Sequence, residues 1–326
     1  MFLVETKIFK ILNIDGQEQQ VLATSYSQIE TYLQCPYKWF VSYLLGRRVV
    51  SEAEALNLGT SIHETLEDYF NGVKQGKHIS LAEAHELLEF NMDSNNIPYA
   101  NEENKKMAEE QHHNMIEGLV EGTSNLANFM KDKEVVACEK AFNLRIDLPF
   151  AILYDGCEYH SIYIIGSIDF IVKDKDGNLH VIDFKSGKTL FKPKKLKENL
   201  QLKIYSLVVD QIYGRLPKST QYYFTRFDEF QSVLPLGKVE NERIVEYYKN
   251  GKIKQKGALT QEVYDELINI FQRQYTIGKY PSNPTPLCSW CTYSPWYGEV
   301  PICSKAKFYQ RKDIPIVHNG LNNKVI

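Results

Sequence analysis

Three charged side chains stand in two short apolar segments of the sequence. Asp169 lies in the segment GSIDF, and Asp183 and Lys185 lie in VIDFKSG. Both segments have the pattern of β-strands, and residues two apart on a strand point to the same face. Asp183 and Lys185 therefore present a carboxylate and an ammonium group side by side. If the two strands pair as a hairpin, Asp169 comes close to Asp183.

Two carboxylates beside a lysine are suited to phosphodiester chemistry. Hard divalent cations such as Mg²⁺ bind one or two carboxylates and keep waters and phosphate oxygens as their other ligands. Such a metal can activate water and neutralise the charge that develops on phosphorus. Lys185 can hold the scissile phosphate or help to position the attacking water. The alternative is an ordinary solvated pair of charges on neighbouring strands.

A run of lysines follows these strands. Glu198 is the only acidic residue between 185 and 203, so the run forms a local basic patch that can follow a phosphate backbone. Gln201 and Tyr205 come next, four residues apart on a predicted helix and hence on one face. The alternative for the patch is a solubilising surface. Its possible DNA contacts are Lys188, Lys192, Lys194, Lys195 and Lys197.

Taken together, the segments resemble the PD-(D/E)XK nuclease superfamily. Within it they are most similar to the RecB-like branch, which includes the AddB nuclease domain and CRISPR-associated RecB-like exonucleases. The GxxD motif of that branch is matched by residues 166–169, and its Asp-x-Lys-(Ser/Thr)-Gly motif by residues 183–187. Its Gln-x-x-x-Tyr motif is matched by residues 201–205, and its Gly-x-x-x-His motif by residues 59–63. The resemblance covers roughly residues 25–305.

The resemblance implies a role for each matched residue. Lys185 would act on the water or the transition state, and Gln201 and Tyr205 would position the substrate. Glu139 could line the same site from its own strand. The implied protein is a Mg²⁺- or Mn²⁺-dependent DNA exonuclease of recombination, repair or replication, which could act with a separate helicase or recombination partner. The implied metal ligands are His63, Asp169, Asp183 and the carbonyl oxygen of Phe184.

The cysteines form a second constellation. Cys288 and Cys291 have the two-residue spacing that clasps one metal, and Cys303 follows after eleven residues. Similar nucleases hold a [4Fe–4S] cluster with one N-terminal and three C-terminal cysteines, so the resemblance implies a cluster on Cys35, Cys288, Cys291 and Cys303 that ties the chain ends together. The gap of eleven residues is longer than is usual in such relatives, so a structural Zn²⁺ in a Cys₄ site is the alternative. Plain buried thiols are expected at Cys138 and Cys157.

The elements that position these residues start with a hairpin. Residues 5–23 alternate between apolar and polar types around Asp15 and Gly16, which favour a turn. Ser27 with Glu30 has the form of a capping box and predicts the start of a helix. Pro36 should kink that helix or split it at Cys35.

Further along, the periodicity predicts a helical region and then a sheet. The helical region covers residues 52–130, with breaks near 76–80 and 95–101. Helices are also expected over residues 198–213 and 258–275, the latter with Thr260 as a possible cap. Residues 175–178 have the composition of a hairpin turn between two strands. The predicted strands are residues 135–148, 160–174, 178–187, 219–227 and 229–236.

The composition excludes several classes of protein. With 326 residues, 43% of them hydrophobic, and a net charge of −3, the chain is neither disordered, fibrous nor uniformly basic. No apolar run approaches the roughly 18 residues of a membrane span. The first sixteen residues carry charges within their apolar stretch and do not resemble a secretory signal, so a cytoplasmic protein is expected. A Gly-x-x-x-x-Gly-Lys-(Ser/Thr) loop is absent, so the sequence carries no helicase motor.

These patterns predict an α/β fold, in which a central mixed β-sheet is flanked by helices, with a helical insertion. The resemblance implies that the core is restriction-endonuclease-like and that an iron–sulfur cluster closes the termini. One alternative function is a catalytically silent DNA-end-binding or assembly module with the same fold. Another is an electron-transfer protein, although flavin and nicotinamide signatures are lacking.

The expected divisions are a hairpin over 1–24, the closure over 25–50 and 280–305, the helical region with its histidine motif over 51–133, the nuclease core over 134–279, and a tail over 306–326.

Overall fold

The computed structural model describes residues 3–4, 8–49, 54–154, 156–294 and 303, so the predicted tail over 306–326 lies outside the described residues. The chain divides into two compact units. The first is formed by Met1–Ser51, Arg145–Ile165 and Glu266–Ile326, and the second by Glu52–Leu144 and Gly166–Asp265. Strands β5 (Lys133–Tyr154) and β6 (Cys157–Asp174) contribute to both units. Among the described residues, no helix is both long and apolar enough to cross a membrane.

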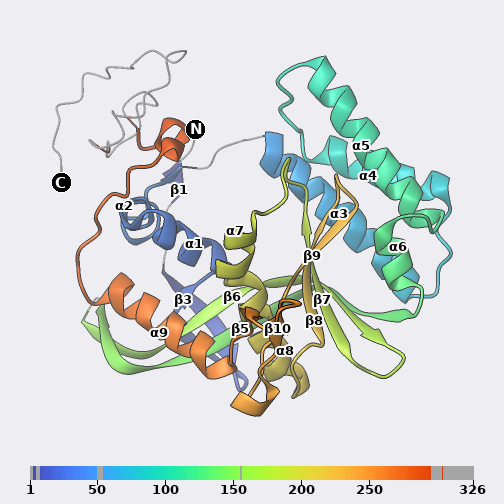
Figure 1. Cartoon of the computed structure of the whole chain (residues 1–326). Coiled ribbons are helices and arrows are strands. Elements are labelled where there is room, and N and C mark those ends of the chain that lie inside the picture. The colour runs from blue at the N-terminus through green and yellow to red at the C-terminus, as the bar shows by residue number, and fades with distance from the viewer. Residues whose placement is uncertain (1–2, 5–7, 50–53, 155, 295–302, 304–326) are drawn as a thin grey trace, which may run out of the picture. The chain divides into compact units, whose positions relative to one another are not determined.

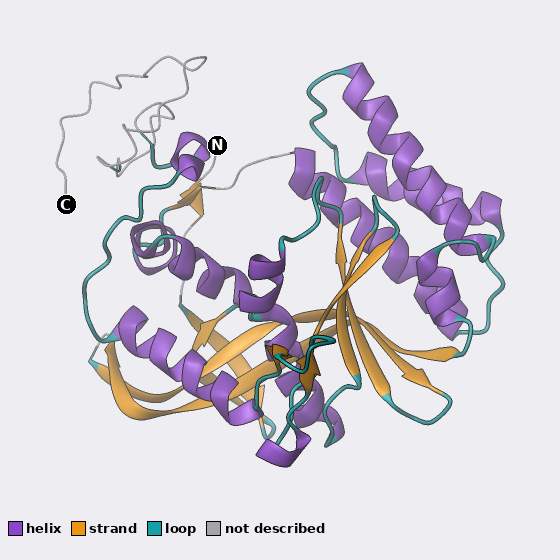
Figure 2. Ribbon diagram, viewed as in Figure 1, coloured by secondary structure: helices purple, strands orange, loops and turns teal. Residues whose placement is uncertain are grey.

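The second unit is built on a mixed β-sheet (Figure 2). Strand β7 (Leu179–Lys185) runs antiparallel to β6 and parallel to β8 (Ser219–Phe224), and β9 (Glu229–Val233) is antiparallel to β8. Every residue of β7 except Lys185 is buried, as expected for a central strand covered on both faces. The sequence prediction of a mixed central sheet flanked by helices is therefore confirmed.

Four helices cover one face of this sheet (Figure 1). The two breaks that the sequence predicts separate the first three, and a third, unpredicted break over 121–124 precedes the fourth. Ser80, Asn101 and Ser124 cap the last three. Apolar side chains at helical spacing, such as Leu66 and Phe70, pack against strand residues of the shared core. The helices are α3 (Glu54–Lys74), α4 (Leu81–Ser94), α5 (Glu102–Val120) and α6 (Asn125–Met130).

The other face of the sheet carries the strand residues Asp183 and Lys185, which are expected to do chemistry. Ile182 and Phe184 pack into the core beneath the four helices, so Asp183 and Lys185, at alternate positions of β7, belong to the opposite face. Helix α8 (Gln201–Tyr213) contacts β7 and β8. The remaining elements of this unit are the short helix α7 (Pro193–Glu198), the 3₁₀ turn η2 (Glu240–Glu242) and the paired strands β10 (Val245–Tyr247) and β11 (Ile253–Lys256).

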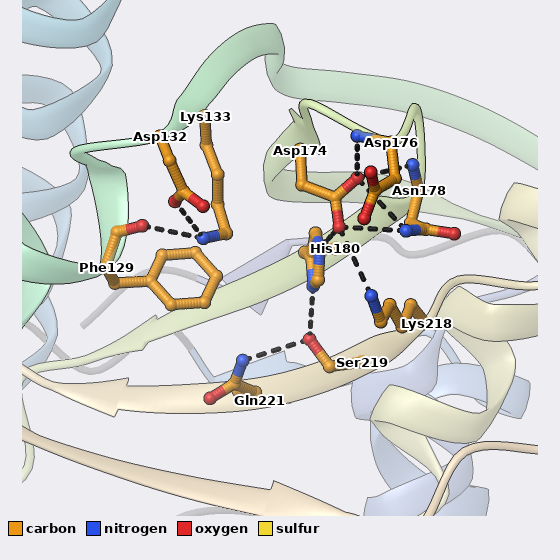
Figure 3. Close-up of polar contacts among 10 residues, drawn as sticks. All are labelled: Phe129, Asp132, Lys133, Asp174, Asp176, Asn178, His180, Lys218, Ser219 and Gln221. Atoms are coloured by element: carbon orange, nitrogen blue, oxygen red, sulfur yellow. Dashed lines mark hydrogen bonds and ion pairs between the residues drawn. The ribbon is translucent and has the colours of Figure 1, made fainter.

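The predicted turn between β6 and β7 is held by the carboxylate of Asp174 (Figure 3). It accepts hydrogen bonds from the side-chain and backbone amides of Asn178, and His180 Nε2 lies 3.1 Å away. These contacts, first of all those from Asn178, hold the pKa of Asp174 well below its usual range. His180 Nδ1 is hydrogen-bonded at 2.8 Å to Ser219 Oγ on β8. The cluster thus ties three neighbouring strands together at the end of β7 away from Asp183.

The first unit opens with the predicted hairpin. Strands β2 (Phe9–Ile14) and β3 (Gln17–Thr24) pair antiparallel around Asp15 and Gly16, whose positive φ angles of 52° and 82° form the turn. The predicted helix start at Ser27 is wrong, because α1 (Tyr26–Gln34) begins earlier. Ser25 has the extended backbone of a cap, and its Oγ accepts the backbone N–H of Gln28 at 3.3 Å.

The split at Pro36 is confirmed. Helix α1 ends before Cys35, and α2 (Pro36–Trp39) continues into a π-helical turn, η1 (Phe40–Leu44). Trp39 is fully buried and meets the rings of Tyr32 and Tyr275 edge-on. The remaining elements are β1 (Leu3–Val4), paired with β4 (Arg48–Val49), and the 3₁₀ turn η3 (Pro286–Trp290). The helix α9 (Thr260–Tyr275) contributes to both units, and its residues from Glu266 onward belong to this one.

Candidate active site

All seven residues of the predicted catalytic centre lie in the second unit. Helix α3 carries His63, and Asp169 lies on β6 next to Phe170, which pairs with Ile182. The antiparallel register therefore brings Asp169 opposite the end of β7, where the remaining strand residues lie. The backbone N–H of Phe184 donates to Asp169 Oδ2 at 2.8 Å, which fixes that carboxylate beside β7.

A three-residue cluster forms around His63. The ligand atoms of His63, Glu139 and Asp169 all lie within 4.8 Å of one another. His63 Nδ1 is 3.4 Å from Asp169 Oδ2 and 3.7 Å from Glu139 Oε1, and Nε2 is hydrogen-bonded to the carbonyl oxygen of Phe184 at 3.0 Å. One histidine and two carboxylates are a donor set suited to a divalent cation.

Glu139 reaches the cluster through an unusual backbone conformation. Its φ angle is 42°, in the left-handed region that residues other than glycine rarely adopt. Such strain is tolerated where the surroundings impose it, and it is concentrated at functional sites. The sequence could suggest Glu139 only as an acidic residue on the strand before Asp169, because nothing in it marks a strand residue with positive φ.

The electrostatics of the cluster follow from burial and crowding. Burial first, and the nearby charge of Asp183 second, raise the pKa of Asp169 to about 7. Burial by itself lowers the pKa of His63, but the hydrogen bond with Glu139 and the charges of the two aspartates outweigh it and raise that pKa to about 9. Buried carboxylates this close together form a negative site that a bound cation would neutralise.

Asp183 does not belong to this three-residue cluster. Its Oδ2 lies 2.5 Å from Lys185 Nζ, as expected for residues two apart on a strand. Lys185 Nζ also donates to Gln201 Oε1 at 3.1 Å, and Gln201 Nε2 donates to the hydroxyl of Tyr205 at 3.1 Å. The structure therefore joins Asp183, Lys185, Gln201 and Tyr205 in one chain of contacts.

Two residues that the sequence analysis missed hold this chain in place. Tyr222 donates its hydroxyl hydrogen to Asn199 Oδ1 at 2.6 Å, and the same oxygen accepts the backbone N–H of Gln201 at 2.8 Å. The ring of Tyr222 lies under Lys185 Nζ, 5.2 Å from its centroid. Tyr222 is opposite Asp183 in the parallel pairing of β7 with β8. That pairing joins strands far apart in sequence, so periodicity alone gave no signal for it.

The five lysines predicted to contact DNA are all exposed in the same unit. Lys188 forms an ion pair with Glu54 at 3.6 Å, and Lys194 lies 3.9 Å from Glu198. Lys195 Nζ lies over the ring of Phe191 at 4.2 Å. The short helix α7, which the sequence analysis does not predict, starts at Pro193 and carries Lys194, Lys195 and Lys197.

The four cysteines of the second constellation line one small cavity of the first unit, together with Tyr37 and Tyr293. The N-terminal and C-terminal segments meet here, because the backbone N–H of Tyr37 donates to Pro281 and Asn283 donates to Gln34. Burial first raises the pKa of Cys291, and the nearby Cys35 and Cys288 raise it further. All six cysteines are free.

Of the two remaining cysteines, one departs from the prediction of a buried thiol. Cys138 is partly buried, but Cys157 is exposed. Cys157 is the first residue of β6 and follows the turn residue Gly156, which has a φ angle of 75°. The prediction for Cys157 is therefore wrong, because the side chain lies at a strand end beside a turn and not inside the sheet.

Comparisons with known proteins agree with this geometry. A family model for the PD-(D/E)XK nuclease superfamily matches residues 23–296. The chain is 27% identical over 198 residues to a subunit of the ATP-dependent helicase/deoxyribonuclease of Clostridium perfringens strain SM101, and 26% identical over the same length to the corresponding subunit from strain 13. Each match covers 56% of this chain but only 17% of the relative, so the chain corresponds to a small part of these proteins. Because the family match spans both the sheet and the candidate active site, the chain belongs to the PD-(D/E)XK nuclease superfamily.

Proposed function

We propose that the protein is a metal-dependent DNA exonuclease that hydrolyses phosphodiester bonds during recombination, repair or replication. The observation that carries the proposal is the meeting of His63, Glu139 and Asp169 within 4.8 Å beside Lys185 and its contacts. Family membership supports nuclease chemistry, and the relatives described above are named as parts of a deoxyribonuclease.

The donor atoms fit a hard divalent cation. Octahedral Mg²⁺ has bonds of about 2.1 Å, which places neighbouring ligands about 3 Å apart. His63 Nε2 and the carbonyl oxygen of Phe184 have that separation, at 3.0 Å. We expect these two groups, with Asp169 and Asp183, to supply the ligands of Mg²⁺ or Mn²⁺, while Glu139 holds the other ring nitrogen of His63. When bound, the metal supplies Lewis acidity that neutralises charge on the scissile phosphate.

Lys185 is the proposed catalytic cation. It is partly exposed, whereas its partner Asp183 is buried, so its ammonium group can reach a phosphate oxygen or the attacking water. Gln201 holds that ammonium group by accepting one of its hydrogen bonds, and Tyr205 fixes the amide of Gln201. Both residues therefore act as positioning residues for Lys185.

We also propose that Cys35, Cys288, Cys291 and Cys303 hold a [4Fe–4S] cluster. The four cysteines line one cavity, as such a site requires. Four thiolates also suit a structural Zn²⁺, which is the alternative.

A partner with helicase activity is part of the proposal. The names of the relatives describe a subunit of a combined helicase and deoxyribonuclease, and the 326 residues of this chain contain no Gly-x-x-x-x-Gly-Lys-(Ser/Thr) loop. We therefore expect strand separation, where it is needed, to come from a helicase outside these 326 residues.

The test compares the wild-type protein with Lys185→Ala on linear and covalently closed circular single-stranded DNA and on end-labelled duplex DNA, with and without Mn²⁺. An exonuclease degrades the linear DNA only with metal and leaves the circle intact, because a circle has no end. Lys185→Ala should remove this activity. The matched control is Lys173→Ala, another strand lysine with an acidic partner, Glu134 at 3.0 Å.

Each other outcome has a defined meaning. Cleavage of the circle would show endonuclease action. DNA binding by the wild-type protein without turnover would favour the catalytically silent module. Full activity of Lys185→Ala would show that the catalytic centre is elsewhere.

A further inference from the structure

The second unit contains a cavity of about 300 Å³, at the low end of the range for ligand pockets. None of its lining residues belongs to the catalytic group, and all of them lie in the second unit. They come from the start of α3, from α5, from the loop after β7 and from the loop after β8. The lining residues are Glu54, Asn104, Met107, Ala108, Gln111, Lys188, Arg226 and Phe227.

Arg226 is held rigidly at this cavity. Its Nε donates to the carbonyl oxygen of Ser186 at 2.7 Å, and its Nη1 donates to Gln111 Oε1 at 2.5 Å. For Nη2, the described residues provide no hydrogen-bond partner. A guanidinium group fixed on two sides and open on the third is preorganised to bind a phosphate oxygen.

The charges of the cavity suit one phosphodiester. Two cations, Arg226 and Lys188, face a single carboxylate, Glu54, which leaves one net positive charge. Lys188 Nζ is 3.6 Å from Glu54 Oε1, and the lysine side chain is 67% exposed, so it can turn toward an incoming phosphate. A phosphodiester carries one negative charge and would complete the balance.

The cavity also presents apolar surface. Phe227 is 45% exposed and Met107 is 47% exposed, although both are large apolar side chains. Aromatic side chains beside a basic groove are the usual platforms on which proteins stack unpaired bases. The two cations therefore suit the phosphate of one nucleotide, and these two apolar side chains suit its base.

The loop after β7 joins the catalytic lysine to the cavity. Lys188 follows Lys185 by three residues, which span at most about 11 Å. Between them, the carbonyl oxygen of Ser186 accepts from Arg226, and Ser186 Oγ lies close to α3, 3.1 Å from where a Cβ at Gly59 would be. Arg226 therefore contacts the segment that joins Lys185 to the cavity.

We propose that this cavity binds one unpaired nucleotide of the DNA strand next to the scissile bond. Arg226 and Lys188 bind its phosphate, and Phe227 and Met107 contact its base. The inference rests on the nuclease function proposed above, to which it adds a subsite for single-stranded DNA.

The first test measures binding of a fluorescent single-stranded oligonucleotide by anisotropy, with Ca²⁺ and in a Lys185→Ala background that does not cut it. Phe227→Ala should raise the Kd about five-fold or more, because each stacked base contributes that much, and Phe227→Trp should restore binding. Lys188→Ala should reduce the slope of log Kd against log salt by about 0.7, the value for one phosphate contact on a single strand.

The controls are matched in residue type and exposure. Phe90→Ala removes an exposed phenylalanine on α4, and Lys175→Ala removes an exposed lysine in the turn before β7; neither lines the cavity. If Phe227→Ala and Lys188→Ala leave the Kd and the salt slope as these controls do, the subsite is wrong.

A second measurement separates this inference from the proposed function. The p-nitrophenyl ester of thymidine 5′-monophosphate contains a scissile phosphodiester but no second nucleotide to fill the cavity. Phe227→Ala should lower kcat/KM for the oligonucleotide and leave that for the ester unchanged. An equal loss on both substrates would show that the variant disturbs the catalytic centre and would overturn the subsite. If the wild-type protein cuts neither substrate, the proposed function fails, while the binding experiment still decides the subsite.

Discussion

At the residue scale, Glu139 is the side chain whose position depends most on its surroundings. Its carboxylate lies 3.7 Å from His63 Nδ1, and this contact lowers its pKa although burial raises it. A charged carboxylate beside the imidazole keeps His63 oriented toward the cluster. Groups of this kind are as important for metal affinity as the ligands that they orient.

We therefore expect Glu139→Gln to weaken Mn²⁺ binding about 10- to 100-fold, the usual cost of losing such a contact. Isothermal titration with Mn²⁺ measures this directly. Glu134→Gln, on the same strand but 77% exposed, is the control and should bind Mn²⁺ normally. Unchanged affinity in Glu139→Gln would remove this residue from the metal site.

Tyr205 provides a second prediction at this scale. Burial, with the nearby aspartates, keeps its pKa well above the usual value, so the hydroxyl stays neutral and accepts from Gln201. Tyr205→Phe removes that acceptor and frees the amide that holds Lys185. We expect kcat on DNA to fall about 10- to 100-fold, because small misplacements of a catalytic group are costly. Tyr213→Phe on the same helix should retain wild-type kcat, and an equal loss there would point to a general effect on α8.

At the element scale, α5 contains a histidine that is buried without charge compensation. His112 is fully buried, and its Nδ1 is hydrogen-bonded to the carbonyl oxygen of Ala108, four residues earlier. Burial lowers its pKa to about 4, and the positive charge of Arg226 acts in the same direction. In the unfolded chain its pKa is near 6.5.

This difference predicts a loss of stability in acid. Between pH 6.5 and 4 the unfolded chain binds the proton and the folded chain does not, so the contribution of His112 is complete above pH 6.5 and falls as the pH drops. The loss amounts to about 3 kcal/mol at the lower end of this range. His112→Leu should show a smaller change in the free energy of unfolding between pH 7 and 4.5, measured with urea. His78→Leu, which replaces an exposed histidine, should behave as the wild-type protein; an unchanged pH profile in His112→Leu would contradict the prediction.

At the scale of the whole molecule, the cysteine site joins segments from the two ends of the described chain. Cys35 directly follows α1, whereas Cys288 and Cys291 belong to the segment around η3. Tyr293 supports the same junction, since its hydroxyl is hydrogen-bonded to Ser42 and to the carbonyl oxygen of Arg47. Bonds from four thiolates to one cluster would fix this junction far more firmly than these hydrogen bonds do.

We expect protein purified without oxygen to contain about four iron atoms per chain and to absorb near about 400 nm. Cys291→Ser should lose the iron and the absorption and should unfold several degrees lower. Cys138→Ser, which changes a cysteine of the other unit, is the control and should retain both. A colourless protein with one zinc ion per chain would show instead that the site is a zinc site.

The sequence by itself determined the local elements and the types of residue that do the chemistry. Alternation and turn residues gave the hairpins, apolar spacing gave the helices, and the Asp-x-Lys spacing placed Asp183 beside Lys185, because these features depend on neighbours a few residues apart. The start of α1 shows the limit of predicting from such local patterns. Ser25 and Ser27 are each followed three residues later by Gln or Glu, so the sequence offers two caps, and the structure uses Ser25.

Only the tertiary structure decided which distant residues meet. It brought Glu139 to His63 through a left-handed backbone position, placed Tyr222 beneath Lys185 through a parallel strand pair, and formed the cavity around Arg226 from four separate segments. These contacts depend on the packing of α3 and α5 with the sheet. Packing of that kind is set by the shape of the whole core and leaves no periodic trace in the chain.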